Sequence, residues 1–155
     1  MKKFLLAIDE GTTGVTAVVM DSELNLVSES SVDFPQVFPK PGWVEHDPDE
    51  IWKAVEKTVR DATSKIDISA LAAIGITNQR ETICFWDRAT VRPVSNAIVW
   101  QDRRTADDCA RLKKRGLEAK FRKATGLLLD PYFSGTKAAW ALKNIPAVKT
   151  AAQEG

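Results

Sequence analysis

Two short apolar runs separated by a glycine-rich turn open the chain, and they restrict its fold more than any other feature. The runs are Lys3–Asp9 (KFLLAID) and Val15–Asp21 (VTAVVMD), with residues 10–14 (EGTTG) between them. Apolar runs of this length that flank a turn are typical of strands, and strands joined so closely pair antiparallel. The chain therefore begins with a β-hairpin that needs a second layer to cover its apolar face.

A third strand and a helix are predicted to follow the hairpin. Residues 25–34 alternate apolar and polar side chains, which extends the hairpin into a three-strand meander. Residues 35–46 are predicted to form a loop because they contain three prolines and a glycine. Asp47 and Pro48 then provide a helix cap and a first-turn proline, and they predict a helix over 48–65. Its apolar face holds Ile51, Trp52, Val55, Val59 and Ala62.

The second half mixes short strands with helices, an order typical of an α/β fold. Three apolar runs are predicted as strands, at 71–77, 82–87 and 96–100, and the first is expected to be fully buried. Helices are predicted at 102–115, 117–124, 135–143 and 146–153. Gly126 is placed to end the second of these helices.

Composition narrows the class of protein. A chain of 155 residues with 44% hydrophobic residues and a net charge of +1 is typical of one soluble globular domain. Charged side chains interrupt every apolar run, so we expect no membrane-spanning segment. With only Cys84 and Cys109 and no leader pattern, we expect a reducing, cytoplasmic location and no disulfide framework.

Residues 103–123 are strongly basic, with nine Lys or Arg against three Asp or Glu. Apolar residues recur between these charges at helical spacing, which favours a solvated helix face. The stretch holds a single aromatic residue, Phe121, and matches no nucleic-acid-binding motif, so we expect no nucleic-acid partner.

The turn after the first strand has the composition of an anion site. Backbone N–H groups at a glycine-containing turn can form a nest around phosphate, and the Thr12 and Thr13 hydroxyls add donors beside Gly11. Asp9, at the strand end, offers a carboxylate that suits Mg²⁺. The turn lacks the Gly-Lys-Ser/Thr of a Walker loop, and no helix follows it. A plain hairpin turn is the alternative.

Four polar residues, 78–81, separate two apolar strands, and they are a second candidate site. Burying such groups without partners costs several kcal/mol each, so they face water or a polar ligand. Arg80 donates and Glu81 accepts hydrogen bonds, a combination that suits a hydroxyl group. An ion pair between the two is the alternative.

Two aromatic residues lie where they could complete such a site. Trp100 ends the strand at 96–100, and α/β sheets keep ligands at such strand ends. A tryptophan there can pack on the C–H face of a polyol, although core packing is an alternative. Tyr132, the only tyrosine, follows Asp130-Pro131 in a loop and can present its hydroxyl. His46 has no second histidine or cysteine at ligand spacing, so no metal role is expected for it.

Five segments together closely resemble the glycerol kinases, a group within the carbohydrate kinases of the actin-like, ribonuclease H-type ATPase fold. They are AIDEGTTG (7–14), FPKPGWVEHDPDEIW (38–52), AAIGITNQRETICFWD (72–87), NAIVWQDRRTA (96–106) and TGLLLDPYFSGTKAAW (125–140). The fold implied is an α/β protein with a mixed sheet, a three-strand antiparallel meander and flanking helices.

The resemblance implies transfer of the γ-phosphate of ATP to a terminal hydroxyl of glycerol, with Mg²⁺ required. By the matching motifs, Arg80, Glu81, Trp100 and Tyr132 are implied as glycerol contacts. In the same way Asp9 is implied at the magnesium site and Gly11, Thr12 and Thr13 at the ATP phosphates. The catalytic base of the family is expected beyond Gly155, so no catalytic residue is assigned here.

Three positions depart from the family pattern. Relatives commonly carry Gln in place of Glu10 and Arg or Lys in place of Thr16, so this chain has less positive charge near the phosphates. Val91 replaces a glycine usual at a turn with positive φ, which we expect to reshape the 87–92 hairpin.

Family members are about three times as long as this chain. The resemblance therefore implies that residues 1–155 form the N-terminal, substrate-binding domain in truncated form, without the second domain that clasps ATP, and that the chain alone is inactive. Glycerol and ATP are the implied partners, with no nucleic acid and no membrane. Whether the protein forms a homo-oligomer, through regions that are not all present in this chain, stays open. The alternatives are a non-catalytic polyol- or phosphate-binding module and a kinase for another small sugar alcohol.

Overall fold

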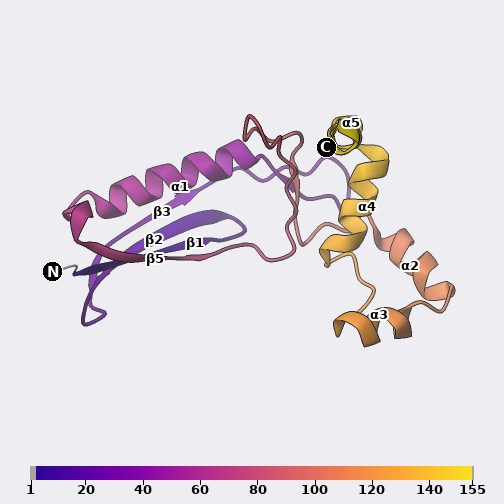
Figure 1. Ribbon diagram of the computed structural model, residues 1–155, viewed down its shortest axis with the longest axis horizontal. Coiled ribbons are helices and arrows are strands. Elements are labelled where there is room, and N and C mark those ends of the chain that lie inside the picture. Colours follow the sequence, from indigo (N-terminus) through magenta and orange to yellow (C-terminus); the bar gives the residue numbers. More distant parts are fainter. Residues whose placement is uncertain (1–2, 155) are drawn as a thin grey trace. The chain divides into compact units, whose positions relative to one another are not determined.

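The predicted meander is confirmed in a computed structural model that describes residues 3–154 (Figure 1). Its strands are β1 (Phe4–Glu10), β2 (Gly14–Asp21) and β3 (Leu26–Asp33). β2 pairs antiparallel with both neighbours, and Asp9 faces Thr16 across the first pair. The local hydrophobic pattern thus fixes the register, because a slip by one residue would turn the apolar face to water.

A fourth strand, β5 (Leu71–Thr77), lies parallel to β1 at the edge of this sheet, whose order is β3-β2-β1-β5. The prediction that this strand is fully buried is wrong for the described chain, since Ile74 and Ile76 are 59% and 66% exposed. Apolar strands of this kind are normally covered on both faces. Within residues 3–154, β1 is the only strand paired with β5.

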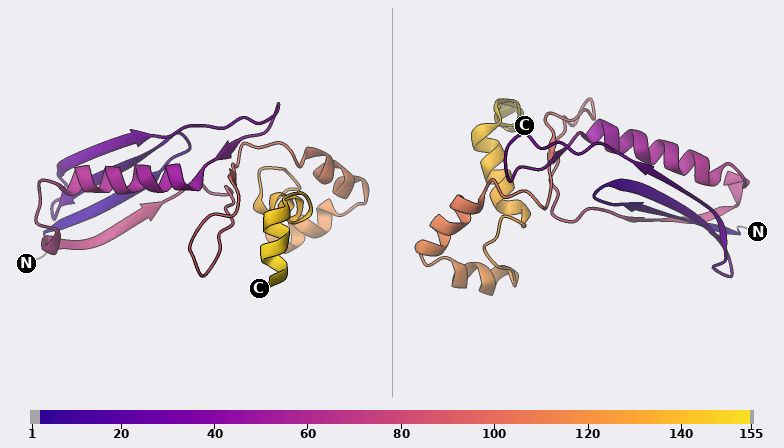
Figure 2. Two further views of the ribbon diagram at one scale, coloured as in Figure 1. Left: turned by 90° about the horizontal axis from the view of Figure 1, so that it is seen from above. Right: turned by 180° about the vertical axis from the view of Figure 1, so that it is seen from behind.

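Helix α1 (Pro48–Thr63) covers one face of the sheet (Figure 2) and packs mainly on β2 and β3. It ends two residues before the predicted boundary and leads into a 3₁₀ turn, Ile68–Ala70. Alternate residues of β1 and β2 point at the helix, as period-two strands require. The core between them consists of Leu6, Ile8, Val15, Ala17, Val19, Phe34, Ala54, Val55 and Ala62.

Short strands replace two predicted elements. The 35–46 loop ends in β4 (Glu45–His46), which pairs antiparallel with β6 (Ala97–Ile98). The strand predicted at 96–100 is therefore shorter. The strand predicted at 82–87 is wrong, because this stretch makes only the isolated bridges Ile83–Ile98 and Trp86–Pro93.

Four helices end the chain, in the predicted order: α2 (Ala106–Lys114), α3 (Glu118–Thr125), α4 (Ser134–Asn144) and α5 (Pro146–Glu154). Gly126 ends α3 in the left-handed conformation, with φ of 75°. α2 begins later than predicted, because Asp102 caps the preceding turn through the Arg104 N–H at 2.8 Å. A small core joins β6, α4 and α5 through Ile98, Ala141 and Val148.

The chain divides into two compact units. The first consists of the residues up to Pro35 together with Pro48–Gln79, and the second of Gln36–Asp47 together with the residues from Arg80 onward. The first unit thus holds the four-stranded sheet with α1, and the second holds β4, β6 and the remaining helices. None of the helices in the described residues has the length and apolar character to cross a membrane.

Candidate functional site

The Glu81 carboxylate lies at the first turn of α4. Its Oε2 accepts hydrogen bonds from the Ser134 backbone N–H at 2.7 Å and from the Ser134 hydroxyl at 2.6 Å. N–H groups at a helix start have no partner within the helix and stabilise an anion there. The hydrogen bonds from Ser134 lower the pKa of Glu81. Partial burial raises this pKa, and the positive charges of Lys137 and Arg80 lower it further. Glu81 is therefore held as a carboxylate.

Glu81 also has an unusual backbone, with φ of 67°. A residue with a side chain reaches the left-handed region at a cost of about 1–2 kcal/mol, and such strain gathers at functional sites. The backbone conformation and the two Ser134 bonds together set the direction of the carboxylate.

Two polar groups at residues 80 and 81 are available to a ligand: the second oxygen of the Glu81 carboxylate and the Arg80 guanidinium. Within residues 3–154, Glu81 Oε1 and the exposed Arg80 guanidinium have no hydrogen-bond partner, and the two side chains form no ion pair. The ion-pair alternative is therefore not what the described residues show. An unpartnered acceptor beside an unpartnered cation can take a hydroxyl group that donates to one and accepts from the other.

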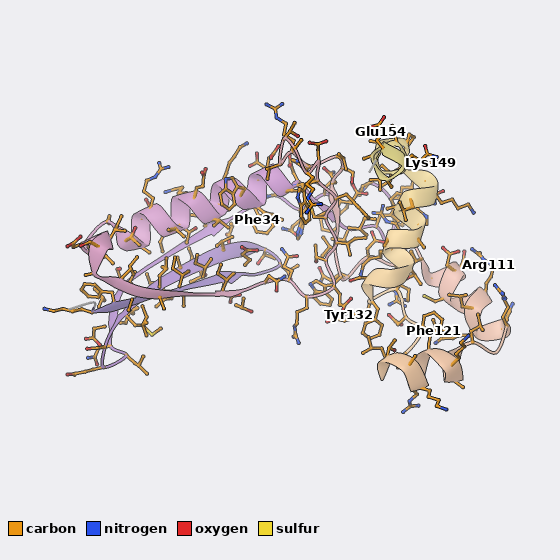
Figure 3. All side chains as sticks on the ribbon, viewed as in Figure 1. Phe34, Arg111, Phe121, Tyr132, Lys149 and Glu154 are labelled. Carbon is orange, nitrogen blue, oxygen red and sulfur yellow. The ribbon has the colours of Figure 1, made fainter. Side chains whose placement is uncertain are left out.

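Trp100 and Tyr132 meet in the same unit. Their rings pack edge to face, with centroids 5.7 Å apart and an interplanar angle of 66°. The backbone N–H of Trp100 donates to the Thr82 hydroxyl at 3.2 Å, and the backbone N–H of Tyr132 donates to Asp130 Oδ1 at 2.9 Å. Figure 3 shows Tyr132 at the start of α4. Of the four predicted polyol residues, the structure thus brings these two into contact and places Arg80 and Glu81 in the same unit.

A buried ion network holds the 36–47 segment in this unit. Arg104, 1% exposed at its side chain, bonds Asp102 Oδ2 at 2.8 Å and Glu45 Oε1 at 2.7 Å. Its guanidinium also lies 3.9 Å from the centroid of the Trp43 ring. Asp102 in turn accepts from the Val44 N–H at 2.7 Å. This network is structural, and sequence analysis did not identify it.

Ser134 and Lys137 are the site residues that sequence analysis missed. Both lie in the first turn of α4, where Ser134 binds Glu81 and Lys137 is fully buried. The segment SGTK reads as an ordinary helix start, so its local pattern carries no sign of these long-range contacts. His46 is also fully buried and bonds Gln36 at 2.5 Å. No group of three His, Cys, Asp or Glu side chains that could hold a metal ion occurs in the described residues.

In the first unit, Asp9 lies in a row of hydroxyl side chains. Thr16 on β2 and Thr77 on β5 are its direct cross-strand neighbours, on the sheet face opposite α1. In the antiparallel pair of β1 with β2, directly opposite residues such as Asp9 and Thr16 are about 4.5–5.5 Å apart at Cβ. The three residues line a shallow hollow of about 410 Å³. Thr77 was not identified from the sequence, because only the parallel register of β5 brings it beside Asp9.

The turn after Asp9 is tight for reasons of local packing. A Cβ at Gly14 would lie 2.8 Å from the Val32 backbone carbonyl oxygen, so pairing with β3 requires glycine there. A Cβ at Gly11 would lie 3.0 Å from the Gly14 carbonyl oxygen across the turn. The Thr13 carbonyl accepts from the Phe34 N–H at 3.2 Å. The turn is thus held at a fixed place beside Asp9, with Thr12 and Thr13 at its tip.

Glu10 and Thr16 lie near this turn, and they concern its charge and its hydrogen bonds. Partial burial raises the pKa of Glu10, which favours its neutral form. The Thr16 hydroxyl bonds that of Ser31 at 2.8 Å on the next strand. For Mg²⁺, the Asp9 carboxylate with the Thr16 and Thr77 hydroxyls beside it fits an ion completed by phosphate oxygens and water.

Curated relatives match the whole chain. The glycerol kinase of Chelativorans sp. (strain BNC1) is 56% identical over 157 residues, and that of Sinorhizobium fredii (strain NBRC 101917 / NGR234) is 57% identical over the same length. Both alignments cover 100% of this chain but only 31% and 32% of the relative. The chain therefore spans about a third of the length of the curated relatives it matches.

Solved structures show the same fold. Plasmodium falciparum glycerol kinase with ADP superposes with a TM-score of 0.90 and 34% identity, covering 98% of this chain and 31% of the other. Gluconate kinase from Lactobacillus acidophilus gives 0.86 and 28%, covering 95% and 30%. The predicted mixed α/β fold of the actin-like ATPases is confirmed. Residues 4–154 match the N-terminal domain of the FGGY family of carbohydrate kinases, and the chain belongs to that family.

Proposed function

We propose that this chain is the polyol-binding part of a kinase that transfers the γ-phosphate of ATP to a terminal hydroxyl of glycerol. The observation that carries the proposal is the Glu81 carboxylate, which is fixed by Ser134 through one oxygen and open at the other. The curated glycerol kinases, at 56% and 57% identity, support glycerol as the polyol.

Recognition of glycerol divides among the four residues of the second unit. Glu81 Oε1 accepts a hydrogen bond from a hydroxyl, and Arg80 donates to the oxygen of a hydroxyl. The Trp100 ring covers a C–H face, and the Tyr132 hydroxyl supplies a further donor and acceptor. Holding a small, flexible triol in one orientation is the main contribution that a protein makes to phosphoryl transfer, whose catalysis is mostly positioning and charge stabilisation.

The phosphate half of the proposal belongs to the first unit. The backbone N–H groups and hydroxyls at Gly11, Thr12 and Thr13 would bind phosphate oxygens, and Asp9 would hold Mg²⁺ directly or through water. Thr16 and Thr77 flank Asp9 and would orient that water. The ion, when bound, neutralises charge on the phosphates. The ADP bound in the Plasmodium falciparum structure supports a nucleotide partner.

Calorimetric titration of the purified chain with glycerol tests the polyol half. We expect saturable binding to the wild type, at least tenfold weaker binding to Arg80→Ala, and no change in Arg88→Ala, an exposed arginine in the 87–92 turn. The same titration with longer sugar alcohols reports the specificity. Absence of binding to the wild type would contradict the proposal, and tighter binding of a longer sugar alcohol would replace glycerol as the substrate.

A second assay concerns the reaction itself. We expect no ADP release by the chain alone when ATP, Mg²⁺ and glycerol are supplied, because this chain provides the positioning groups and no assigned base. Glycerol-dependent ADP release would contradict the assignment of the chain as one part of the kinase.

A further inference from the structure

Lys137 is a buried charge that the proposed function does not use. It is 0% exposed and lies on α4, one helical turn after Ser134. Residues three apart on a helix share a face, so Lys137 and Ser134 point to the same side. Lysine is almost never fully buried without partners, so the groups that Lys137 contacts indicate what it does.

The Lys137 ammonium binds the backbone of the loop that carries Tyr132. Nζ donates to the Tyr132 carbonyl at 2.5 Å and to the Pro131 carbonyl at 3.3 Å. Two successive carbonyls held by one charged group fix the orientation of the peptide between them. The Tyr132 ring packs against Trp100 at 5.7 Å, so this peptide sets the position of one wall of the polyol site.

The titratable groups around Lys137 are three carboxylates and one thiol. Desolvation by burial lowers the pKa of Lys137 from 10.5 to about 8, against the charges of Glu81, Asp102 and Asp130, which raise it. Burial raises the pKa of the Cys109 thiol above 9.0, so the thiol stays neutral near pH 8. In return, the Lys137 charge contributes to lowering the pKa of Glu81.

We propose that Lys137 is a positioning residue for the polyol site: its ammonium clamps the Pro131 and Tyr132 carbonyls and supports the Glu81 carboxylate held by Ser134. This inference rests on the proposed function, since it assigns how the same site is kept in shape. One turn of α4 then orders both walls of the site, Glu81 through Ser134 and Tyr132 through Lys137.

The clamp makes the site sensitive to pH in a defined direction. As pH rises through about 8, Lys137 loses its charge, so its bonds to the carbonyls weaken and Glu81 loses a neighbouring cation. Glycerol binding should weaken by roughly threefold to tenfold. The same titration makes the native state more stable between about 8 and 10.5, because the unfolded chain binds the proton more tightly there. If glycerol binds more weakly in this pH range, the titration of Lys137 cannot have caused it by unfolding the chain.

The single tyrosine permits a test that needs no ligand. Tyr132 is the only tyrosine, so a chain with ring-labelled tyrosine gives NMR signals of one residue. We expect its ring signal to shift in one step near pH 8 in the wild type, to lose that step in Lys137→Met, and to keep it in Lys143→Met. Lys143 is an exposed lysine on the same helix and provides the matched control. Lys137→Arg, charged throughout, should keep wild-type glycerol affinity at pH 7 and lose the pH dependence.

The outcomes separate the two proposals. No step in the wild type, or an identical step in Lys137→Met, overturns the clamp, and the wild-type titration decides this even if that variant fails to fold. A tyrosine step without glycerol binding supports the clamp and contradicts the proposed function. Glycerol binding with the same affinity at pH 7 and pH 9.5 overturns the role of the Lys137 charge in the site.

Discussion

Leu24, Glu81 and Val91 are the residues other than glycine that adopt positive φ within 3–154, and they differ in what their side chains do. Glu81 is fixed by Ser134, so its strained backbone aims a carboxylate. Val91 is 74% exposed in a turn closed by backbone bonds, with its own N–H donating to the Asp87 carbonyl at 2.8 Å. The strain at Val91 therefore has no compensating side-chain contact of this kind.

Val91→Gly should stabilise the chain. Glycine adopts φ of 58° without steric cost, although it loses more freedom on folding, and the net gain is about 0.5–1 kcal/mol. Chemical denaturation measures the free energy of unfolding. The matched control is Val27→Gly on exposed strand β3, which should destabilise the chain by a similar amount. Equal destabilisation by both would show that the turn does not require positive φ.

Glu10→Gln should strengthen phosphate binding. Glu10 adjoins Asp9 and the proposed phosphate turn, where its negative charge opposes an anion. We expect inorganic triphosphate with Mg²⁺ to bind roughly threefold to tenfold more tightly, the effect of about 1 kcal/mol at a partly exposed site. Calorimetry measures the affinity, and Glu29→Gln on β3 serves as the control. Weaker binding in Glu10→Gln would indicate that Glu10 itself holds the magnesium ion.

At the scale of elements, long-range contacts rather than local pattern build the second unit. Arg104 joins the 36–47 segment to the residues before α2 through Glu45 and Asp102, both on the same guanidinium nitrogen. Because the partners are buried, removing the cation leaves a carboxylate without compensation, which costs about 3–5 kcal/mol.

Arg104→Ala should therefore destabilise the second unit strongly, while Arg103→Ala should not. Arg103 forms an exposed pair with Asp130 at 3.0 Å, and such pairs contribute about 0–1 kcal/mol. Urea denaturation followed by tryptophan fluorescence compares the two, since Trp43 and Trp140 both contact the Arg104 guanidinium. Similar midpoints for both variants would show that the buried network does not hold the segment.

The contrast between local signals and long-range contacts explains which parts of the fold the sequence predicts. The meander and α1 follow from local signals: period-two alternation, a glycine turn and a capped helix with one apolar face. β4 and β6 have two residues each and exist only because distant segments pair, so no local pattern predicts them. The apolar β5 has the composition of a buried strand, but burial depends on what lies beside it.

The candidate site divides in the same way. The sequence offers Arg80, Glu81, Trp100 and Tyr132 as candidates, because polar groups after an apolar strand and aromatic residues at a strand end or in a loop suit a polyol, and their roles stay predictions. Ser134 and Lys137 act through bonds to residues far from them or to backbone carbonyls, and such contacts leave no mark in the local sequence. The need for glycine at position 14 is set by the backbone of the next strand at Val32.

At the scale of the whole molecule, the two proposed half-sites belong to different units. The polyol residues lie in the second unit, and Asp9 with its turn lies in the first. The units have separate cores, around the sheet and α1 in one and around β6, α4 and α5 in the other. Each half-site can therefore be tested with its own ligand.

Titration of the ring-labelled chain with glycerol, followed through the signal of Tyr132, tests directly whether the second unit binds the polyol. We expect a saturable shift of this one signal in the wild type and in Arg88→Ala. In Arg80→Ala, and in Glu81→Gln, which keeps the shape of the side chain but removes its charge, we expect an affinity at least tenfold weaker. A Tyr132 signal unchanged by glycerol, or shifted with equal affinity in all four proteins, would contradict the proposed polyol site.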